Sequence, residues 1–332
     1  MQSDIKKFFN NKNILITGGT GSFGKATTEY LLKANPKKIV IFSRDELKQY
    51  HMQKDNNDER LRFFLGDVRD KDRLILALKG IDIVIHAAAL KHVPKAELDP
   101  SEFIKTNILG SENIIYASLE NNVQRVMFIS TDKAVNPINL YGSTKLCAEK
   151  LFVASNNIVG SQNIKLSISR YGNVINSRGS LLPLISEKKK NKQNIFLTHK
   201  EMTRFFITLE EGVKFVLTNI IRMQGGEIFI PKMNAYKIEE IIKKLTNQKT
   251  IPISGIRDGE KIHETLIGID ESSKVIDYGK FYLIEPFRMF DDDKRNYKKN
   301  TLKEKGRKIS KRFEYTSRNT INFDKNLLKS KY

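Results

Sequence analysis

The sequence predicts an α/β protein built on a doubly wound parallel sheet, with a smaller lobe in its C-terminal part. From the N-terminus to about residue 170, short apolar runs alternate with longer helical patterns. This alternation is typical of parallel strands that are buried on both faces and linked by helices. A glycine-rich loop follows the first apolar run, and a tyrosine and a lysine four residues apart follow the fifth. Both features lie at the carboxyl ends of strands, where open α/β sheets bind ligands.

The apolar runs predict six strands, and the segments between them predict helices. The expected strands are residues 13–17, 38–42, 61–65, 81–85, 126–129 and 165–169. The expected helices are residues 22–34, 46–53, 71–78 and 102–120, and one that contains Tyr141. After Arg170 the pattern becomes irregular, and glycine and proline residues interrupt it. We therefore expect a first domain over residues 1–170, a lobe over 171–285 that intermittently joins this domain, and a basic extension over 286–332.

The bulk composition is that of an ordinary globular protein. Of its 332 residues, 39% are hydrophobic and 29% are charged. The formal charge of +20 attracts anions, whether nucleotides, nucleic acids or membranes. We favour a general lysine-rich composition over a nucleic-acid site, because no aromatic residues interleave with the basic ones as in a single-strand binder. We also expect no membrane insertion, since no uncharged apolar stretch reaches membrane length.

The numbers of cysteines and histidines bear on three classes of protein: disulfide-stabilised, metal-binding and secreted. Cys147 is the single cysteine, which excludes an intramolecular disulfide framework and indicates a reducing, cytoplasmic compartment. It lies on the Tyr141 helix among apolar residues, so we expect it to be a small core residue. The five histidines have no metal-ligand spacing, and no metal site is expected. The N-terminus lacks the apolar segment of a signal peptide.

The glycine-rich loop reads Thr-Gly-Gly-Thr-Gly-Ser-Phe-Gly over residues 17–24. Its spacing lets backbone amides close on a pyrophosphate at the N-terminus of the following helix. The loop therefore predicts a dinucleotide cofactor bound by a Rossmann domain over residues 1–170. The expected contacts from this loop are Gly18, Thr20, Gly21, Ser22, Phe23 and Gly24.

The end of the second strand indicates which dinucleotide binds. Ser43 and Arg44 suit the 2′-phosphate of NADP, whereas an NAD enzyme usually places a carboxylate there. Asp45 and Glu46 either serve as that carboxylate or begin a helix, where the helix dipole favours acidic residues. We expect NADP, with NAD as the alternative. Further cofactor contacts are expected from residues that follow the third and fourth strands, namely Asp67, Val68, Ala87, Ala88 and Lys91.

Residues 130–145 contain the largest group of candidate catalytic residues in the chain. Thr131, Asp132 and Lys133 follow the fifth strand directly. Tyr141 and Lys145 are four residues apart and share one face of a helix. A tyrosine and a lysine at this spacing also occur by chance, but their position after a strand and downstream of the glycine loop argues against chance. An acid, a base and a redox-assisting pair thus lie in one short segment.

Together these segments resemble the extended short-chain dehydrogenase/reductase family and, within it, the inverting UDP-N-acetylglucosamine 4,6-dehydratases. The resemblance covers nearly the whole chain. The matching segments are residues 17–24, 43–46, 88–94, 130–134, 136–142, 170–174, 177–180, 202–205, 225–229 and 259–261. Asn176 and Asp258 depart from the family, which often has glycine and proline there, but both residue types tolerate turns. The resemblance implies NADP as the cofactor, UDP-N-acetylglucosamine as the substrate and a homo-oligomeric assembly.

The resemblance also implies roles for the five residues of the 130–145 segment. Tyr141, acidified by Lys145, takes the proton of the sugar 4-hydroxyl, and Thr131 hydrogen-bonds the same oxygen. Lys133 then removes the carbon-5 proton, and Asp132 protonates the departing 6-hydroxyl. Because a lysine base must be neutral, we expect burial, Lys145 and the cationic nicotinamide to lower the pKa of Lys133.

Several residues of the second half are candidates for binding the substrate. Lys91 is expected near the nicotinamide, where it positions the ring or the sugar. Arg204 and Arg257 suit the UDP diphosphate, because the guanidinium presents a rigid fork of donors. The full expected substrate set is Lys91, Asn173, Arg178, Ser180, Thr203, Arg204, Arg257 and Glu260.

The leading interpretation is a hydro-lyase that forms UDP-2-acetamido-2,6-dideoxy-β-L-arabino-hex-4-ulose for a surface or flagellar glycan such as pseudaminic acid. By resemblance, lysine at position 133 indicates the inverting branch, since retaining enzymes typically carry glutamate there. A nucleotide-sugar 4-epimerase is the first alternative: it shares the Tyr141–Lys145 pair but does not need Asp132 and Lys133. A non-catalytic NADP-sensing protein is the second alternative, and it has no need of any of these side chains.

Overall fold

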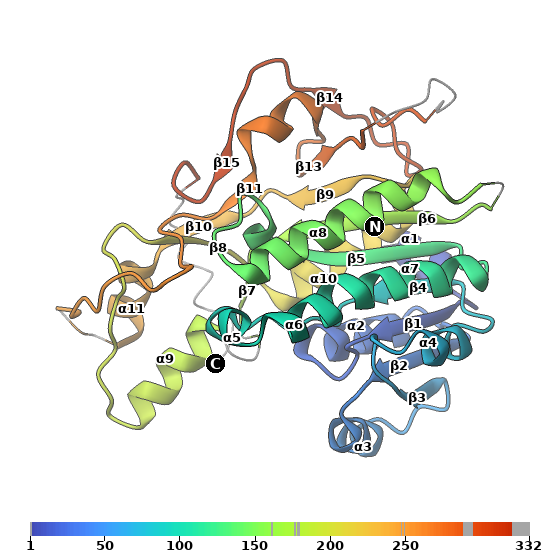
Figure 1. Ribbon diagram of the computed structural model, residues 1–332, viewed down its shortest axis with the longest axis horizontal. Coiled ribbons are helices and arrows are strands. Elements are labelled where there is room, and N and C mark those ends of the chain that lie inside the picture. The colour runs from blue at the N-terminus through green and yellow to red at the C-terminus, as the bar shows by residue number, and fades with distance from the viewer. Residues whose placement is uncertain are drawn as a thin grey trace.

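A single large sheet forms the centre of the computed structural model (Figure 1). The structure describes residues 2–160, 162–175, 177, 180–246, 248, 250–287 and 295–320. Ten strands of this part form the sheet in the order β14-β12-β13-β9-β6-β5-β4-β1-β2-β3. The run from β3 to β9 is parallel, whereas β13, β12 and β14 are antiparallel to their neighbours. The doubly wound parallel sheet predicted from the sequence is confirmed.

The first half of the chain alternates strands and helices. Its strands are β1 (Asn13–Thr17), β2 (Lys38–Ser43), β3 (Leu61–Leu65), β4 (Ile83–His86), β5 (Arg125–Thr131) and β6 (Lys165–Tyr171). Its helices are α1 (Gln2–Phe9), α2 (Ser22–Leu32), α3 (Glu46–Asp55), α4 (Lys71–Ala77), α5 (Val93–Leu98), α6 (Pro100–Phe103), the π-helix η1 (Ile104–Leu109), α7 (Gly110–Glu120), η2 (Asp132–Ala134), α8 (Leu140–Ala154) and η3 (Ser155–Asn157). All six predicted strands form. The helix predicted over residues 102–120 is instead a succession of α6, η1 and α7.

The second half both adds a lobe and returns to the main sheet. Its strands are β7 (Asn173–Val174), β8 (Thr203–Ile207), β9 (Ile228–Pro231), β10 (Asn234–Lys237), β11 (Thr265–Ile267), β12 (Val275–Asp277), β13 (Phe281–Ile284), β14 (Arg307–Lys308) and β15 (Tyr315–Thr316). Its helices are α9 (Leu181–Lys190), α10 (Leu209–Arg222), α11 (Ile238–Thr246) and η4 (Ile269–Lys274). The small sheet β10-β8-β7 carries α9 and α11 beside it, away from the main sheet (Figure 1). The lobe therefore has its own hydrophobic cluster, which includes Phe206 and Ile241.

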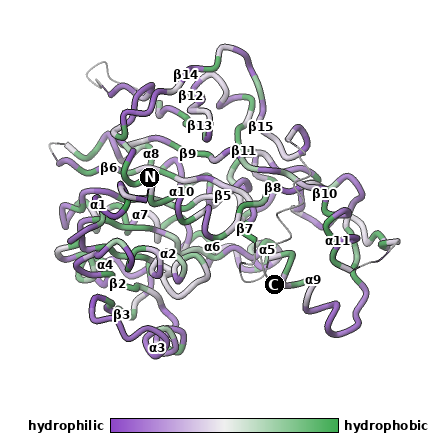
Figure 2. The backbone as a smooth tube through the Cα atoms, turned by 180° about the vertical axis from the view of Figure 1, so that it is seen from behind, coloured by the Kyte–Doolittle hydropathy of each residue, from purple (hydrophilic) through white to green (hydrophobic). Residues whose placement is uncertain are grey.

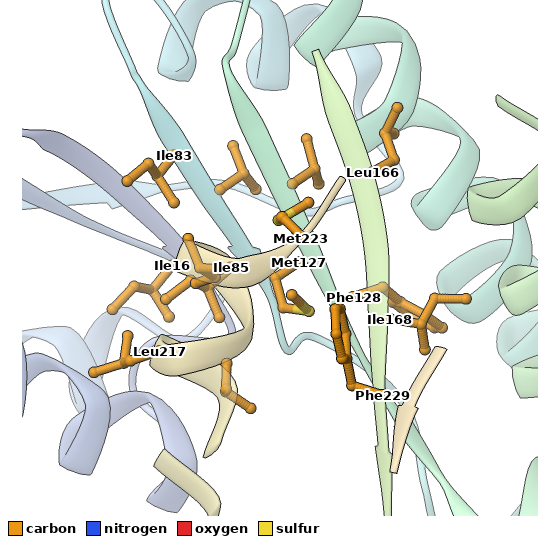
Figure 3. Packing of buried hydrophobic residues seen from close by; sticks show 14 of the residues in the cluster. Ile16, Ile83, Ile85, Met127, Phe128, Leu166, Ile168, Leu217, Met223 and Phe229 are labelled. Atoms are coloured by element: carbon orange, nitrogen blue, oxygen red, sulfur yellow. The ribbon is translucent and has the colours of Figure 1, made fainter. Parts of the chain in front are cut away.

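The central strands form the core because apolar residues cover both of their faces. Ile14, Leu15 and Ile16 of β1 have no exposed surface, and the same holds for Val126 and Met127 of β5. Figure 3 shows side chains of the central strands packed against residues of the segment that contains α10. Figure 2 shows hydrophobic residues along the central strands and hydrophilic ones along α3. Each such buried side chain contributes about 1.5–3 kcal/mol of hydrophobic stabilisation, which fixes the strand ends that carry the site.

A further feature of the fold differs from the sequence-based expectation. Cys147 was expected in the core, but it is exposed on α8, because the buried face of this helix passes through Ala148 and Phe152. In the described part of the basic extension, β14 joins the main sheet and β15 pairs with β11. Within the described residues, no helix has the length and apolarity needed to cross a membrane.

Candidate active site

The segment from β5 to α8 brings five predicted residues together at the carboxyl end of the main sheet. β5 ends at Thr131, and the short turn η2 places Asp132 and Lys133 directly after it. α8 then begins beside this turn, with Asn139 as its N-cap accepting a 2.7 Å hydrogen bond from the amide of Gly142. A Cβ atom at Gly142 would collide with the backbone of Lys133. Glycine therefore allows the helix to approach the turn closely.

Asp132 has no exposed surface. Its Oδ1 accepts hydrogen bonds from the Thr131 hydroxyl at 2.9 Å and from Lys133 Nζ at 3.0 Å. Its Oδ2 has no hydrogen-bond partner among the residues that the structure describes. Burial raises the pKa of Asp132, and the negative charge of Glu264 raises it further, against the lowering effect of Lys133. A carboxyl in this state is suited to carry a proton and donate it.

The ammonium group of Lys133 lies between two carboxylates. Its Nζ is 3.0 Å from Asp132 Oδ1 and 3.3 Å from Glu264 Oε1. Burial lowers the pKa of Lys133, but the two carboxylates outweigh it and raise this pKa above its usual value. The pKa of Lys133 is therefore raised, and not lowered as expected from the sequence. The reason is geometric: Lys145 Nζ donates to the carbonyl of Ile129 at 2.8 Å, while the charges facing Lys133 are mainly negative.

Tyr141 and Lys145 are both buried on the face of α8 that meets β5. Burial raises the pKa of Tyr141 to about 12, with partial compensation from the charge of Lys133 and a hydrogen bond with Thr131. Burial also lowers the pKa of Lys145 to about 7. Its Nζ lies 3.9 Å from the centre of the Phe128 ring. The pKa of Tyr141 is thus raised, and not lowered by Lys145 as expected, because desolvation of the phenol dominates.

The glycine loop forms a backbone cradle that fits a dinucleotide. Gly18 has a φ of +65°, and a Cβ atom there would lie 3.0 Å from the backbone of Ala88. A Cβ atom at Gly24 would lie 2.5 Å from Gly19 Cα. The hydroxyl oxygen of Thr17 accepts hydrogen bonds at 3.2 Å from the amides of residues 87 and 88, which ties β1 to the end of β4. Side chains would fill this cradle, so the glycines keep backbone amides open at the N-terminus of α2.

The other expected cofactor residues lie around the same edge. Thr20 is in the loop, Ser22 and Phe23 are in the first turn of α2, Asp67 and Val68 follow β3, and Ala87, Ala88 and Lys91 follow β4.

The end of β2 lies where NADP and NAD would make different contacts. Asp45 is the N-cap of α3 and accepts a 2.9 Å hydrogen bond from the amide of Lys48. Ser43 Oγ accepts a hydrogen bond from Gln49 at 3.0 Å, which leaves its own hydroxyl able to donate. Arg44 is half-exposed, 3.8 Å from Asp67 Oδ2. The carboxylate nearest the expected ribose is therefore engaged by the helix, while a cation is available.

Arg204 and Thr203 of β8 contact the segment that contains Glu264. Arg204 donates hydrogen bonds to the carbonyls of Thr203, Ile262 and Lys261 at 2.8, 3.0 and 2.7 Å. Its Nε lies 3.5 Å from Glu264 Oε1. The Thr203 hydroxyl contacts His263 and Ser317 at 2.7 Å each and has no exposed surface. These two residues are thus engaged within the protein, and their role toward a ligand stays a prediction.

The remaining substrate candidates are spread over the lobe. Asn173 Oδ1 on β7 and Ser180 Oγ at the start of α9 are buried without a hydrogen-bond partner among the described residues. Glu260 lies 3.8 Å from Arg204. Arg257 and Lys91 are exposed, whereas Arg178 lies outside the described residues. Unsatisfied buried polar atoms are costly, so Asn173 and Ser180 fit a ligand that would hydrogen-bond them.

Two residues of the site were not anticipated. Glu264 is only 2% exposed and contacts Lys133, as described above. Lys261 Nζ donates to the carbonyl of Val135 at 2.5 Å, and burial lowers its pKa. Lys261 belongs to a segment that matches the family, which was the only available signal. Residues 250–264 form no helix or strand, so no periodicity predicts where their side chains point.

The fold and this site define a member of the extended short-chain dehydrogenase/reductases. The chain belongs to the family described as polysaccharide biosynthesis protein, whose model matches residues 14–286.

Curated relatives of known name match almost the whole chain. It is 52% identical over 316 residues to a UDP-N-acetylglucosamine 4,6-dehydratase (inverting) from Campylobacter jejuni, covering 94% of each chain. It is 40% identical over 320 residues to a UDP-glucose 4-epimerase from Rickettsia typhi, covering 94% of this chain and 92% of the relative.

Solved structures share the fold. Pen from Bacillus thuringiensis is 34% identical, with a TM-score of 0.87 and coverage of 96% of this chain and 97% of that one. A dTDP-glucose 4,6-dehydratase from Streptomyces venezuelae, solved with NAD bound, is 20% identical, with a TM-score of 0.69 and coverage of 75% and 86%. This second likeness shows the fold alone.

Proposed function

We propose that this protein is an inverting UDP-N-acetylglucosamine 4,6-dehydratase. Its product would be UDP-2-acetamido-2,6-dideoxy-β-L-arabino-hex-4-ulose. The observation that carries the proposal is the pair formed by the buried Asp132 and the partly buried Lys133, 3.0 Å apart, beside Tyr141. A dehydratase needs an acid and a base of this kind in addition to the tyrosine. The 52% identity to the Campylobacter jejuni enzyme supports the same reaction.

We propose NADP as the cofactor. Gly18, Gly21 and Gly24 would hold its pyrophosphate, and Ser43 and Arg44 would hold its 2′-phosphate. The engagement of Asp45 as a helix N-cap supports NADP over NAD. When bound, the cofactor supplies a hydride acceptor for carbon 4, a positive ring charge, and a hydride donor for carbon 6.

Tyr141 and Lys145 act on the sugar 4-hydroxyl. Tyr141 would have its pKa lowered by the positive ring charge of the bound cofactor, which favours the phenolate. The phenolate accepts the hydroxyl proton as carbon 4 is oxidised, and Thr131 hydrogen-bonds the same oxygen. Lys145 has a pKa of about 7, so it gains or loses a proton readily near neutral pH. The resulting 4-ketone makes the carbon-5 proton acidic enough to be removed by an amine.

Asp132 and Lys133 then eliminate water. The carbon-5–hydrogen bond breaks and its proton goes to the Lys133 amine. The carbon-6–oxygen bond breaks and the leaving hydroxide takes the proton of the Asp132 carboxylic acid, which forms water. Before this step Lys133 is a neutral amine and Asp132 a carboxylic acid. After it they are an ammonium and a carboxylate, which is the ion pair in the structure. A proton transfer along the 3.0 Å hydrogen bond restores the reactive form without any net gain or loss of protons.

The raised pKa of Lys133 is therefore compatible with its role as a base. Both forms of the pair hold the same number of protons, so the pH need not exceed the pKa of an isolated lysine. The bound substrate would only have to favour the neutral tautomer over the ion pair. Displacement of solvent from the partly exposed Lys133 side chain would act in that direction.

The test is the fate of UDP-N-acetylglucosamine incubated with the enzyme and NADP⁺ in D₂O. The proposal requires a new methyl signal in the proton spectrum and deuterium at carbon 5. The main rival is a 4-epimerase, favoured by the 40% identity to the Rickettsia typhi protein. An epimerised sugar that retains its 6-hydroxyl would refute the dehydratase and support this rival.

We also propose that the enzyme acts in the cytoplasm as a homo-oligomer and supplies a surface or flagellar glycan such as pseudaminic acid. The lone cysteine, Cys147, supports a reducing compartment. Light scattering coupled to size-exclusion chromatography tests the assembly, and loss of the glycan after deletion of the gene tests the pathway.

A further inference from the structure

Glu264 is a buried carboxylate that joins the catalytic lysine to the substrate lobe. It is 2% exposed. Its Oε1 lies 3.3 Å from Lys133 Nζ on one side and 3.5 Å from Arg204 Nε on the other. Its Oε2 has no hydrogen-bond partner within the described residues. A carboxylate in such a place is costly to bury, so its two cationic neighbours must compensate for the lost hydration.

The backbone of Glu264 is held by the C-terminal extension. The Glu264 amide donates to Ser317 Oγ at 2.9 Å, and the Ser317 amide donates to the Glu264 carbonyl at 2.8 Å. Ser317 has no exposed surface and follows β15, which pairs with β11 directly after Glu264. Tyr315 of β15 is anchored in turn by hydrogen bonds with the backbone of Met233. The extension thus sets the position of the Glu264 side chain relative to η2.

The charges around Glu264 distinguish it from Asp132. The attraction of Lys133, Arg204 and Lys261 holds the pKa of Glu264 below its usual range despite burial. Burial and the charge of Glu264 raise the pKa of Asp132. Of the two carboxyl groups that contact Lys133, Glu264 therefore keeps its charge while Asp132 can take up a proton. The titratable groups that surround Glu264 are Asp132, Lys133, Tyr141, Arg204, Glu260, Lys261 and His263.

We propose that Glu264 is a positioning residue for the dehydration step. It keeps Lys133 Nζ within hydrogen-bond distance of Asp132, and because it stays ionised, the exchangeable proton moves only between Lys133 and Asp132. This inference rests on the proposed dehydratase function. In this arrangement Glu264 does not touch the reacting carbons. It stabilises the ammonium that Lys133 becomes after taking the carbon-5 proton. Glu264 should consequently affect elimination and leave the oxidation of carbon 4 unchanged.

The test compares Glu264→Gln with the wild-type holoenzyme in single-turnover experiments on UDP-N-acetylglucosamine. Absorbance of reduced nicotinamide reports oxidation, and rapid-quench NMR of the methyl product reports elimination. We expect elimination to slow by about 10- to 100-fold, a share of the general acid–base effect, while oxidation keeps its rate. Loss of one negative charge should also move the pH profile of elimination to lower pH, because it lowers the pKa values of Asp132 and Lys133.

Glu227→Gln is the matched control. Glu227 is equally buried but accepts its hydrogen bonds from Ser167, Gln224 and Gly225, away from the site. This variant should lower the melting temperature without moving the pH profile. If Glu264→Gln does not fold, Glu264→Asp replaces it. The shorter aspartate keeps the negative charge but places it farther from Lys133, so elimination should slow without a shift of its pH profile.

The outcomes of these experiments separate the role of Glu264 from the proposed function. Selective loss of elimination in a Glu264 variant supports the inference. Wild-type elimination and an unchanged pH profile, or equal slowing of oxidation and elimination, would overturn it. Failure of the wild-type enzyme to dehydrate the sugar would instead overturn the proposed function.

Discussion

Arg170 at the end of β6 forms a two-pronged ion pair with Glu149 of α8, the helix that carries Tyr141 and Lys145. Arg170 Nε donates to Glu149 Oε1 at 2.9 Å and Nη2 donates to Oε2 at 2.5 Å. The same guanidinium bonds Glu271 of η4 at 2.8 and 2.9 Å. Arg170 is 1% exposed, so these charges depend on one another for solvation. This triad connects α8 to the second half of the chain.

Substitution of Arg170 by alanine should destabilise the protein strongly. Two carboxylates would lose their partner, one of them fully buried, and breaking such a pair costs about 3–5 kcal/mol. Chemical denaturation measures the change. Arg60→Ala is the control, because the Arg60–Asp58 pair is partly exposed and should cost about 1 kcal/mol or less. Similar losses in both variants would contradict the structural role of the triad.

Substitution of Gly18 by alanine should weaken cofactor binding. The new Cβ would face the backbone of Ala88 at 3.0 Å and close the cradle, in addition to the strain of a φ of +65°. Gly80 has a similar φ of +69° but nothing within 4 Å of its Cβ position. Gly80→Ala therefore reports the strain alone. Calorimetric titration with NADP⁺ should show a loss of at least tenfold for the first variant and little change for the second, and equal affinities would disprove the assignment of the loop.

Lys133→Ala should retain NADP and lose dehydration. The substitution removes the base but leaves the glycine cradle and the Tyr141–Lys145 pair intact. A general base contributes about 10²- to 10⁴-fold to a rate, so the methyl product should fall by that factor. Product NMR and a cofactor-binding titration are the two measurements. Unchanged turnover would remove Lys133 from the mechanism.

The stability of the protein should fall in acid because of His86. Burial lowers its pKa from 6.5 to about 3. The unfolded chain therefore binds a proton below pH 6.5 that the folded protein does not bind, and stability declines as the pH falls from about 6.5 to about 3. Burial keeps the ring neutral, and both of its nitrogens have hydroxyl partners: Nδ1 lies 2.7 Å from the Thr17 hydroxyl oxygen and Nε2 lies 3.1 Å from Ser111 Oγ.

Denaturation at several pH values checks this effect. In His86→Gln the unfolding free energy should vary less between pH 6.5 and pH 4 than in the wild type. His51→Gln is the control, since His51 is exposed on α3, and its curve should run parallel to that of the wild type. A His86 variant with undiminished acid sensitivity would show that other groups cause it.

Helix 102–120 illustrates a limit of local patterns. Its apolar spacing predicts a continuous helix, yet the middle portion is the π-helix η1. The wider turn accompanies Asn107, whose side chain accepts from the Leu90 amide and donates to the Leu90 carbonyl, each at 2.9 Å. Leu90 lies in the loop after β4. The change in winding thus accompanies a contact between residues 17 positions apart. The apolar spacing within residues 102–120 cannot predict such a contact.

The sequence by itself determined the parallel sheet, the glycine loop and the grouping of residues 131–145. These features depend on short-range periodicity and on motifs whose members are close together along the chain. Tertiary structure alone decided the protonation chemistry. The pKa of Lys133 is raised first by the neighbouring Asp132 and then by Glu264, which is 131 positions away and lies 3.3 Å from its ammonium group. Charge and desolvation act through space, and only the folded chain brings such distant groups together.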